Sequence, residues 1–425
     1  MLKLLAWPLK QSRARELLAR IVQHKTTINT TFSAEIWQDL QGIKQDVPHV
    51  QEALTDSQRH AMLEWLQHDD PSPIHNMSIG LVEEGTCDWV TETPEWSEWV
   101  NLDSQCLWIH GIPGSGKTVL AAHLIEELRQ VCDQPRKDHW VSVYYYYHHL
   151  RNKDESLSFL SWIVSQLCRT AGKVPNHLRR IYQRGGQPKQ VEILSCLEQS
   201  LVWFDQVFVT IDALDESRPT TPLLALLRTL ATDIRFRKVR LLATSRKYAD
   251  IQQTMVGIAL PLSMAHPSVE RDLAVSVRRM IESAPRFGGW PLNFREEVIS
   301  KLSKESEGMF RLAICRLDVL KHAASVEEAV NVLYHLPHSL EDTYNRILTS
   351  IAKEDWPLVR HVLQMLCFHY WLYDHWHQAR LPHTLILDTY AARSGRSNCF
   401  YTLETLQDIC GCLVAFPTPW KGKAF

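Results

Sequence analysis

Short apolar runs alternate with amphipathic segments through the middle of the chain. Runs that are apolar at nearly every position are typical of parallel strands buried on both faces. Residues 119–128 instead carry apolar side chains at helical spacing, as expected for a helix that packs on such a sheet. The pattern predicts an α/β protein whose strands include residues 106–109, 140–147, 207–211, 239–244 and, at one edge, 258–260.

Helical periodicity dominates on both sides of this region. Before it we predict three helices, at residues 16–24, 32–50 and 59–66, followed by a linker at residues 69–73. The second of these carries one apolar face that runs from Phe32 to Val50. After the sheet we predict an arm of helices with mixed apolar and polar faces, at residues 268–283, 294–303, 306–322, 326–334 and 339–351.

Length and charge narrow the class of protein. A chain of 425 residues suggests two or three compact units. The net charge of −2 and the lack of a basic tract do not favour a nucleic-acid partner. No apolar stretch is long enough to span a membrane, and the first ten residues lack a signal-peptide cleavage site. Ten cysteines without a regular CxxC pair suit reduced thiols, so we expect a cytoplasmic protein.

The sequence GIPGSGKT at residues 111–118 matches the phosphate-binding loop G-x-x-x-x-G-K-[ST] and directly follows a predicted strand. The glycines allow successive backbone N–H groups to point at phosphates, the lysine reaches the β- and γ-phosphates, and the threonine hydroxyl ligates Mg²⁺. A glycine-rich turn that binds nothing is the alternative. We expect nucleotide binding by Gly111, Gly114, Ser115, Gly116, Lys117 and Thr118.

A second motif, VFVTIDALDE at residues 207–216, supplies acidic residues at the end of a predicted strand. Asp212 falls where ligands of open α/β sheets bind and suits a water-mediated contact to Mg²⁺. Asp215 and Glu216 follow closely enough to polarise an attacking water. A solvated acidic turn would have a similar sequence, but the order and spacing relative to the phosphate loop favour the metal site.

The strand at residues 239–244 is followed by Ser245 and Arg246. In P-loop ATPases whose sheet inserts a strand between the two motif strands, the tip of that strand faces the γ-phosphate. Arg246 is therefore a candidate γ-phosphate sensor, with an exposed surface arginine as the alternative. GTP specificity has no support, because Asn152, Lys153 and Asp154 lack the spacer of the guanine-binding motif and precede the acidic strand.

These motifs together resemble the NACHT ATPases of the STAND class, particularly fungal NOD-like proteins with a nephrocystin 3-like N-terminal module. The resemblance rests on GIPGSGKT, on DALDE and on ATSR at residues 243–246. It extends to GTCDWV and PEWSEWV before the loop, and to EGMFRLAICRLDVL and LPHSLEDTYNRIL after the sheet. In all it covers roughly residues 66–350.

The fold implied by this resemblance is a three-layer αβα P-loop NTPase sheet of the ASCE type, with strand order 5-1-4-3-2. We expect an N-terminal helical segment at residues 1–68, the NACHT domain at 69–262, a helical arm at 263–352 and a divergent or incomplete winged helix at 353–425. The first segment starts abruptly and is either the end of a signalling domain or a helical cap on the ATPase. No internal repeat is visible, so we expect either a truncated gene model or a short family member without a sensor.

The resemblance also implies a function: a signalling switch that binds ATP or ADP with Mg²⁺, hydrolyses ATP slowly and forms homo-oligomers when an unknown protein or ligand triggers it. A nucleotide-binding scaffold with negligible hydrolysis is one alternative. A metabolic P-loop kinase is another, although the sequence has no arginine-rich lid. Residues 367–380 carry Cys367, His369, His375 and His377, whose spacing matches no standard zinc site.

Overall fold

The computed structural model describes residues 16, 19–25, 56–67, 70–135, 137, 139–148 and 154–365. The chain divides into two compact units, residues 1–66 and 67–425. Within the first unit, residues 19–25 and 56–66 are helical, in agreement with two of the three helices predicted there. The predicted helix at 32–50, the histidine-rich stretch at 367–380 and most of the predicted winged helix lie outside the described residues. The proposed domain boundaries remain predictions.

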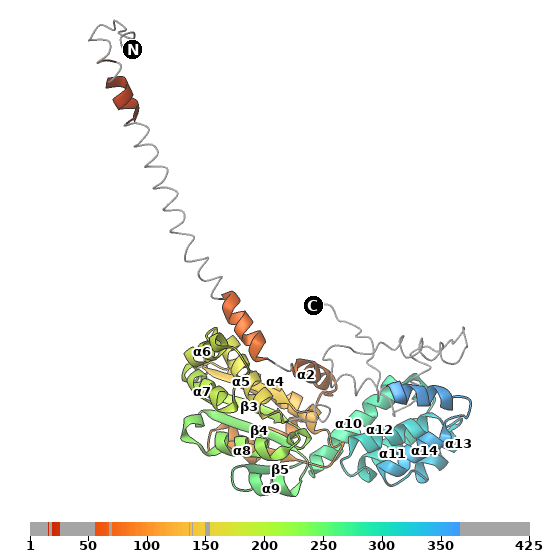
Figure 1. Ribbon diagram of the computed structural model, residues 1–425. Coiled ribbons are helices and arrows are strands. Elements are labelled where there is room, and N and C mark those ends of the chain that lie inside the picture. Colours follow the sequence, from red (N-terminus) through yellow and green to blue (C-terminus); the bar gives the residue numbers. More distant parts are fainter. Residues whose placement is uncertain are drawn as a thin grey trace. The chain divides into compact units, whose positions relative to one another are not determined.

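Five parallel strands form one sheet in the order β2-β3-β4-β1-β5 (Figure 1). This is the predicted order 5-1-4-3-2 counted from the other edge, so that prediction is confirmed. Ile109 of β1 is aligned with Thr244 of β4, and Ile211 of β3 with Ala243, so the carboxyl ends of three strands meet at one edge. The strands are β1 (Cys106–His110), β2 (Trp140–Tyr146), β3 (Gln206–Asp212), β4 (Val239–Ser245) and β5 (Leu260–Ser263).

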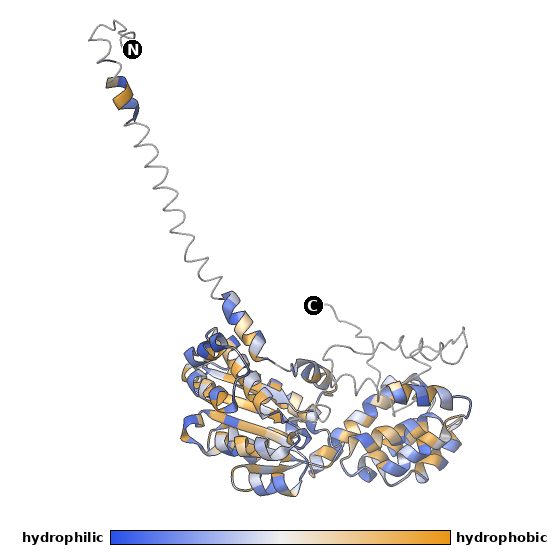
Figure 2. Ribbon diagram, viewed as in Figure 1, coloured by the Kyte–Doolittle hydropathy of each residue, from blue (hydrophilic) through white to orange (hydrophobic). Residues whose placement is uncertain are grey.

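Helices cover both faces of the sheet and complete the αβα architecture. On one face lie α3 (Pro94–Val100) and α4 (Lys117–Cys132), with α2 (Ser72–Ile79) packed on α4. On the other face lie α5 (Ser156–Ala171) and α8 (Thr220–Thr232). Figure 2 shows hydrophobic residues concentrated along the central strands, whereas the surrounding helices alternate between hydrophobic and hydrophilic residues.

The elements between the strands and after the sheet are also helical. Between strands lie α6 (Asn176–Arg184), α7 (Gln190–Ser200) and α9 (Ala249–Met255). Leu273, Phe294 and Leu317 belong to a hydrophobic cluster of the arm that also includes Leu333. The arm therefore has a hydrophobic core separate from that of the ATPase sheet. The arm helices are α10 (Pro267–Ser283), α11 (Leu292–Glu305), α12 (Phe310–Lys321), α13 (Val326–Tyr334) and α14 (Leu340–Ser350).

Three predicted boundaries are wrong for local reasons. The edge strand begins at Leu260 rather than 258, because the N–H groups of residues 258 and 259 both bond to the Met255 carbonyl and close a turn. The arm helix predicted from 306 begins at Phe310, because residues 307 and 308 have φ angles of 48° and 77°. The predicted linker at 69–73 already contains the start of α2 at Ser72.

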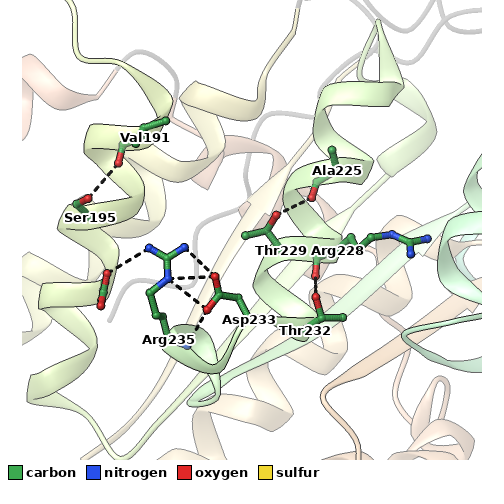
Figure 3. Close-up of polar contacts among 9 residues, drawn as sticks. Val191, Ser195, Ala225, Arg228, Thr229, Thr232, Asp233 and Arg235 are labelled. Atoms are coloured by element: carbon green, nitrogen blue, oxygen red, sulfur yellow. Dashed lines mark hydrogen bonds and ion pairs between the residues drawn. The ribbon is translucent and has the colours of Figure 1, made fainter.

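Local polar contacts surround the turn that precedes β4 (Figure 3). Asp233 accepts bonds from the Arg235 backbone and guanidinium, which shapes the short turn between α8 and β4. Arg235 also lies 3.5 Å from a carboxylate oxygen of Glu198 on α7. The hydroxyls of Thr229 and Thr232 bond to carbonyls one turn earlier in α8, so the hydrogen-bonding capacity of these hydroxyls is used within the helix.

Six cysteines of the described residues, Cys87, Cys106, Cys132, Cys168, Cys196 and Cys315, are free and buried. No helix among the described residues is both long and apolar enough to cross a membrane. Within the same residues, no three His, Cys, Asp or Glu side chains gather as a metal-binding group.

Gly308 tests how the arm helix is positioned. A Cβ at Gly308 would lie 3.5 Å from Val269, an ordinary contact, but its φ of 77° is left-handed. We expect Gly308→Ala to lower the free energy of unfolding by about 1 kcal/mol, because L-residues pay this cost in the left-handed region. Thermal unfolding would measure it, with Gly257→Ala as control because Gly257 has no such φ and no atom within 4 Å of its added Cβ. Equal midpoints for both variants would contradict the prediction.

Candidate functional site

The phosphate loop joins β1 to α4 and has the backbone form that the motif requires. Gly114 and Gly116 have φ angles of 73° and 87°, which L-residues rarely adopt. The loop is anchored at its base, where the Gly111 N–H bonds to the Ser245 carbonyl of β4 at 3.2 Å. The Lys117 ammonium bonds to the carbonyls of Gly111 at 3.0 Å and Ile112 at 2.8 Å and so bridges the loop. These features preform an anion cradle at the N-terminus of a helix.

Lys117 lies among the acidic residues that the sequence predicted for the site. Burial lowers the pKa of Lys117, while the charges of Asp215, Asp212 and Glu216 act in the opposite direction. The fold therefore brings the lysine of the loop together with all three carboxylates from the end of β3. A phosphate group placed in the cradle would add negative charge beside the lysine and favour its protonated form.

Asp212 is the most enclosed of these acids, with 2 % of its surface exposed. Its carboxylate accepts a hydrogen bond from the Thr244 hydroxyl at 2.5 Å and another from the Thr118 hydroxyl. Burial nonetheless raises the pKa of Asp212 to about 6. A cation beside a desolvated carboxylate would restore its charged form, so the oxygen donors of Asp212 and Thr118 suit Mg²⁺, completed by phosphate and water oxygens.

The acidic turn after Asp212 is fixed to β4 by Thr244. Ala213 has a left-handed φ of 59°, and its N–H bonds to the Thr244 hydroxyl oxygen at 3.0 Å. Thr244 thus joins Asp212 to the start of the acidic turn. Thr244 belongs to the ATSR motif, but the motif alone predicts no role for it, because only the pairing of β3 with β4 reveals this contact.

Arg246 is paired with Asp215. Its guanidinium lies 3.2 Å from one carboxylate oxygen, and its backbone N–H bonds to the other at 2.9 Å. The same guanidinium donates to the Tyr248 hydroxyl at 3.1 Å. The Arg246 side chain is 41 % exposed, whereas the Asp215 side chain is 5 % exposed. Asp215 is therefore held in place by Arg246, and Arg246 keeps enough accessibility to contact a ligand.

An apolar cleft of about 310 Å³ opens beside the loop at Ser115 and Gly116. Its chemistry suits a planar base, since binding sites of this kind are mostly apolar with a few polar groups. Trp89 is stacked on His266 with 4.6 Å between ring centroids, and the Asp272 carboxylate bonds to the Cys87 N–H at 2.9 Å. The apolar lining consists of Leu81, Trp89, Val119, Leu120, Met264, Val269, Met280, Phe310 and Ile314.

A larger cleft of about 660 Å³ lies on another side of the loop. It is bordered by His110, Ile112, Arg246, Tyr248 and residues 307–308 of the arm, with Ser115 shared between the two clefts. Its lining is more polar and basic than that of the smaller cleft, because Arg246 and Lys247 contribute to it. The two clefts leave the loop accessible from both the apolar and the charged side.

The arm also contacts the loop directly. The Arg311 N–H at the start of α12 bonds to the Gly114 carbonyl at 3.3 Å. A Cβ added at Gly116 would lie 3.5 Å from the Phe310 ring. Sequence reasoning missed this contact, because residues 310–311 are far from the loop in the chain and belong to no nucleotide-binding motif.

Sequence comparisons place the site in a known context. Residues 85–246 match the family model described as "Nephrocystin 3, N-terminal". The vegetative incompatibility protein HET-E-1 of Podospora anserina is 23 % identical over 309 residues, which are 69 % of this chain. The chain spans 22 % of that relative's length.

Among solved structures, the ORC2 protein of Aeropyrum pernix, described as ADPNP–ADP complexes, aligns with a TM-score of 0.39 and 15 % identity over 78 % of this chain and 89 % of that one. Cdc6p of Pyrobaculum aerophilum aligns with a TM-score of 0.35 and 12 % identity over 72 % and 84 % of the two chains. The two sequence matches confirm the expected resemblance: residues 85–246 are similar to nephrocystin 3-like N-terminal modules, and the chain is similar to a fungal vegetative incompatibility protein.

Proposed function

We propose that this protein is a Mg²⁺-dependent ATP and ADP switch. One observation carries the proposal: Lys117, Asp212, Asp215, Glu216 and Arg246 converge on a phosphate loop that borders an apolar cleft of about 310 Å³. The loop and Lys117 would hold the phosphates, and the cleft would hold the adenine. The Thr118 hydroxyl and the Asp212 carboxylate would hold Mg²⁺, which supplies charge neutralisation at the phosphates.

The acidic turn gives the proposed hydrolysis two candidate bases. Asp215 is held by two bonds from Arg246, which favours a supporting role in which it positions the arginine. Glu216 follows it in the same short 3-10 helix (Leu214–Glu216) and acts on Lys117 electrostatically, as Asp215 does. We therefore assign the polarisation of the attacking water to Glu216 first and to Asp215 second.

Only the γ-phosphate distinguishes ATP from ADP, so a switch needs groups that respond to it. Arg246 is our candidate, because its exposed guanidinium can exchange part of its pairing with Asp215 for a phosphate. Slow hydrolysis would then return the protein to its ADP state. In the proposed cycle an unknown protein or ligand triggers exchange, and the ATP form self-associates.

A nucleotide-binding scaffold with negligible hydrolysis is the second candidate. The pairing of Asp215 with Arg246 favours it, because this contact neutralises one candidate base. The two functions differ in turnover and not in binding. A wild-type protein that binds Mg²⁺-ATP but shows no turnover would be a scaffold.

Binding is the first test. Mg²⁺ with ATP or ADP should stabilise the fold, by about 2.7 kcal/mol when the nucleotide is at a hundred times Kd. Lys117→Ala should remove that stabilisation and leave the apo fold intact, because within the described part of the chain the ammonium bonds to the loop's own carbonyls, at 3.0 and 2.8 Å. A thermal-shift assay with ATP, ADP and GTP measures this. Equal nucleotide stabilisation of wild type and Lys117→Ala would refute the site.

Catalysis is the second test, because substitutions of the three acidic residues should impair different steps. Asp212→Ala should weaken Mg²⁺-dependent binding, since it removes the proposed metal-binding carboxylate. Glu216→Gln should keep ATP affinity and slow turnover by about a hundred-fold or more, the usual contribution of a general base. Asp215→Asn should have a smaller effect on turnover. Phosphate release and calorimetry separate these effects, and wild-type turnover in both Glu216→Gln and Asp215→Asn would exclude the water-activating role.

Self-association is the third test. Mg²⁺ with a non-hydrolysable ATP analogue should shift the purified chain from monomer towards higher oligomers, and ADP should do so less. Lys117→Ala is the matched control and should not respond to either nucleotide. Light scattering after size exclusion measures the mass. A strict monomer in every nucleotide state, from a sample shown to contain nucleotide, would count against self-association by this chain.

A further inference from the structure

A second arginine besides Arg246 lies at the phosphate loop. It comes from the arm, whereas Arg246 follows β4 of the sheet. Arg311 begins α12, and its N–H bonds to the Gly114 carbonyl at 3.3 Å. A Cβ added at Gly114 would lie 2.8 Å from the Arg311 Cβ, so the root of this side chain rests on the turn of the loop. The backbone of Arg311 is thereby fixed beside the cradle.

The Arg311 guanidinium contacts Tyr344 on α14. Its Nε donates to the Tyr344 hydroxyl at 2.9 Å, and the guanidinium carbon lies 5.8 Å from the centre of the ring. Burial raises the pKa of Tyr344, so the phenol is neutral at physiological pH. A neutral phenol is a weaker acceptor than a phosphate, because charge-assisted bonds of arginine are about twice as strong as neutral ones.

The position of Arg311 matters for which phosphate it can reach. In a loop of this type the backbone N–H groups cradle the inner phosphates, whereas the terminal phosphate of a triphosphate projects beyond the cradle. A further cation is therefore most useful at the terminal phosphate. Arg246 approaches from β4 and is paired with a carboxylate, whereas Arg311 approaches from the arm and donates to a phenol.

We infer that Arg311 is a phosphate-sensing residue that exchanges the Tyr344 hydroxyl for the terminal phosphate of bound ATP. This rests on the proposed nucleotide site and adds the path by which that site acts on the arm. With ADP the guanidinium stays on Tyr344 and ties α12 to α14. With ATP it turns to the phosphate, and the contact between these two arm helices weakens.

The two partners of the bond give variants with opposite expected effects. Arg311→Ala should lower affinity for the non-hydrolysable analogue adenylyl imidodiphosphate about ten- to a hundred-fold. This is the loss of affinity expected when one hydrogen bond between charged groups is removed. Tyr344→Phe should raise that affinity about two- to ten-fold, because it removes one acceptor that competes with the phosphate. Both should leave ADP affinity within about two-fold. Arg278→Ala is the control, since Arg278 pairs with Glu296 within the arm and should affect neither nucleotide.

Calorimetry with Mg²⁺ and each nucleotide measures the affinities, and hydrogen exchange of α14 measures the arm. In wild type the analogue should speed exchange in α14 relative to ADP, and in Arg311→Ala it should not. Equal losses for both nucleotides in Arg311→Ala would assign it a purely structural role and overturn the inference. If that variant does not fold, Tyr344→Phe decides alone, and unchanged analogue affinity there overturns the inference. A wild-type protein that binds neither nucleotide would instead refute the proposed function itself.

Discussion

The Asp212 carboxylate imposes the constraint around which the site is built, because a buried carboxylate without partners costs several kcal/mol. The partners come from two other elements: the Thr244 hydroxyl from β4 and the Thr118 hydroxyl from the start of α4. One carboxylate thus fixes the relative positions of a strand end, a second strand end and the phosphate loop. The raised pKa of about 6 indicates that these bonds compensate burial only in part. A divalent cation would supply the remainder.

Residues around Asp212 also connect neighbouring elements of the site. Thr244 also accepts the Ala213 N–H, and Asp215 accepts the Arg246 N–H, so β4 and the acidic turn are joined twice. The Trp108 indole of β1 donates to the Ser245 hydroxyl at 2.8 Å, which in turn donates to the Arg246 carbonyl. Arg246 is therefore positioned by its backbone as well as by its ion pair. A conformational response to nucleotide at this position must come from its partly exposed side chain.

The parts that the sequence predicted are those encoded locally. The β1 strand, the loop and the end of β3 each occupy a short continuous segment, and their residue types dictate their conformation, as with the glycines of left-handed φ. The apolar cleft was not predictable in this way. It combines Trp89 of the short 3-10 helix Asp88–Val90 with Met280 of α10 and Phe310 of α12, and none of these segments indicates a binding site by itself. The start of α12 was predicted too early because the helical periodicity of the sequence continues through Gly308, whereas the backbone there has a left-handed φ and is not helical.

The glycines of the loop have two reasons to lack side chains. Toward a nucleotide they let the backbone N–H groups approach phosphate. Toward the protein they admit close neighbours, since an added Cβ would lie 2.9 Å from Met264 at Gly111 and 2.8 Å from Arg311 at Gly114. The loop is therefore packed between its ligand side and the arm, with no slack for a side chain at either residue. A change of loop shape on one side must displace atoms on the other, because close-packed interiors transmit strain instead of absorbing it. In the proposed switch, this packing would give a bound nucleotide a physical route to the arm that needs no contact between the base and the arm's own core.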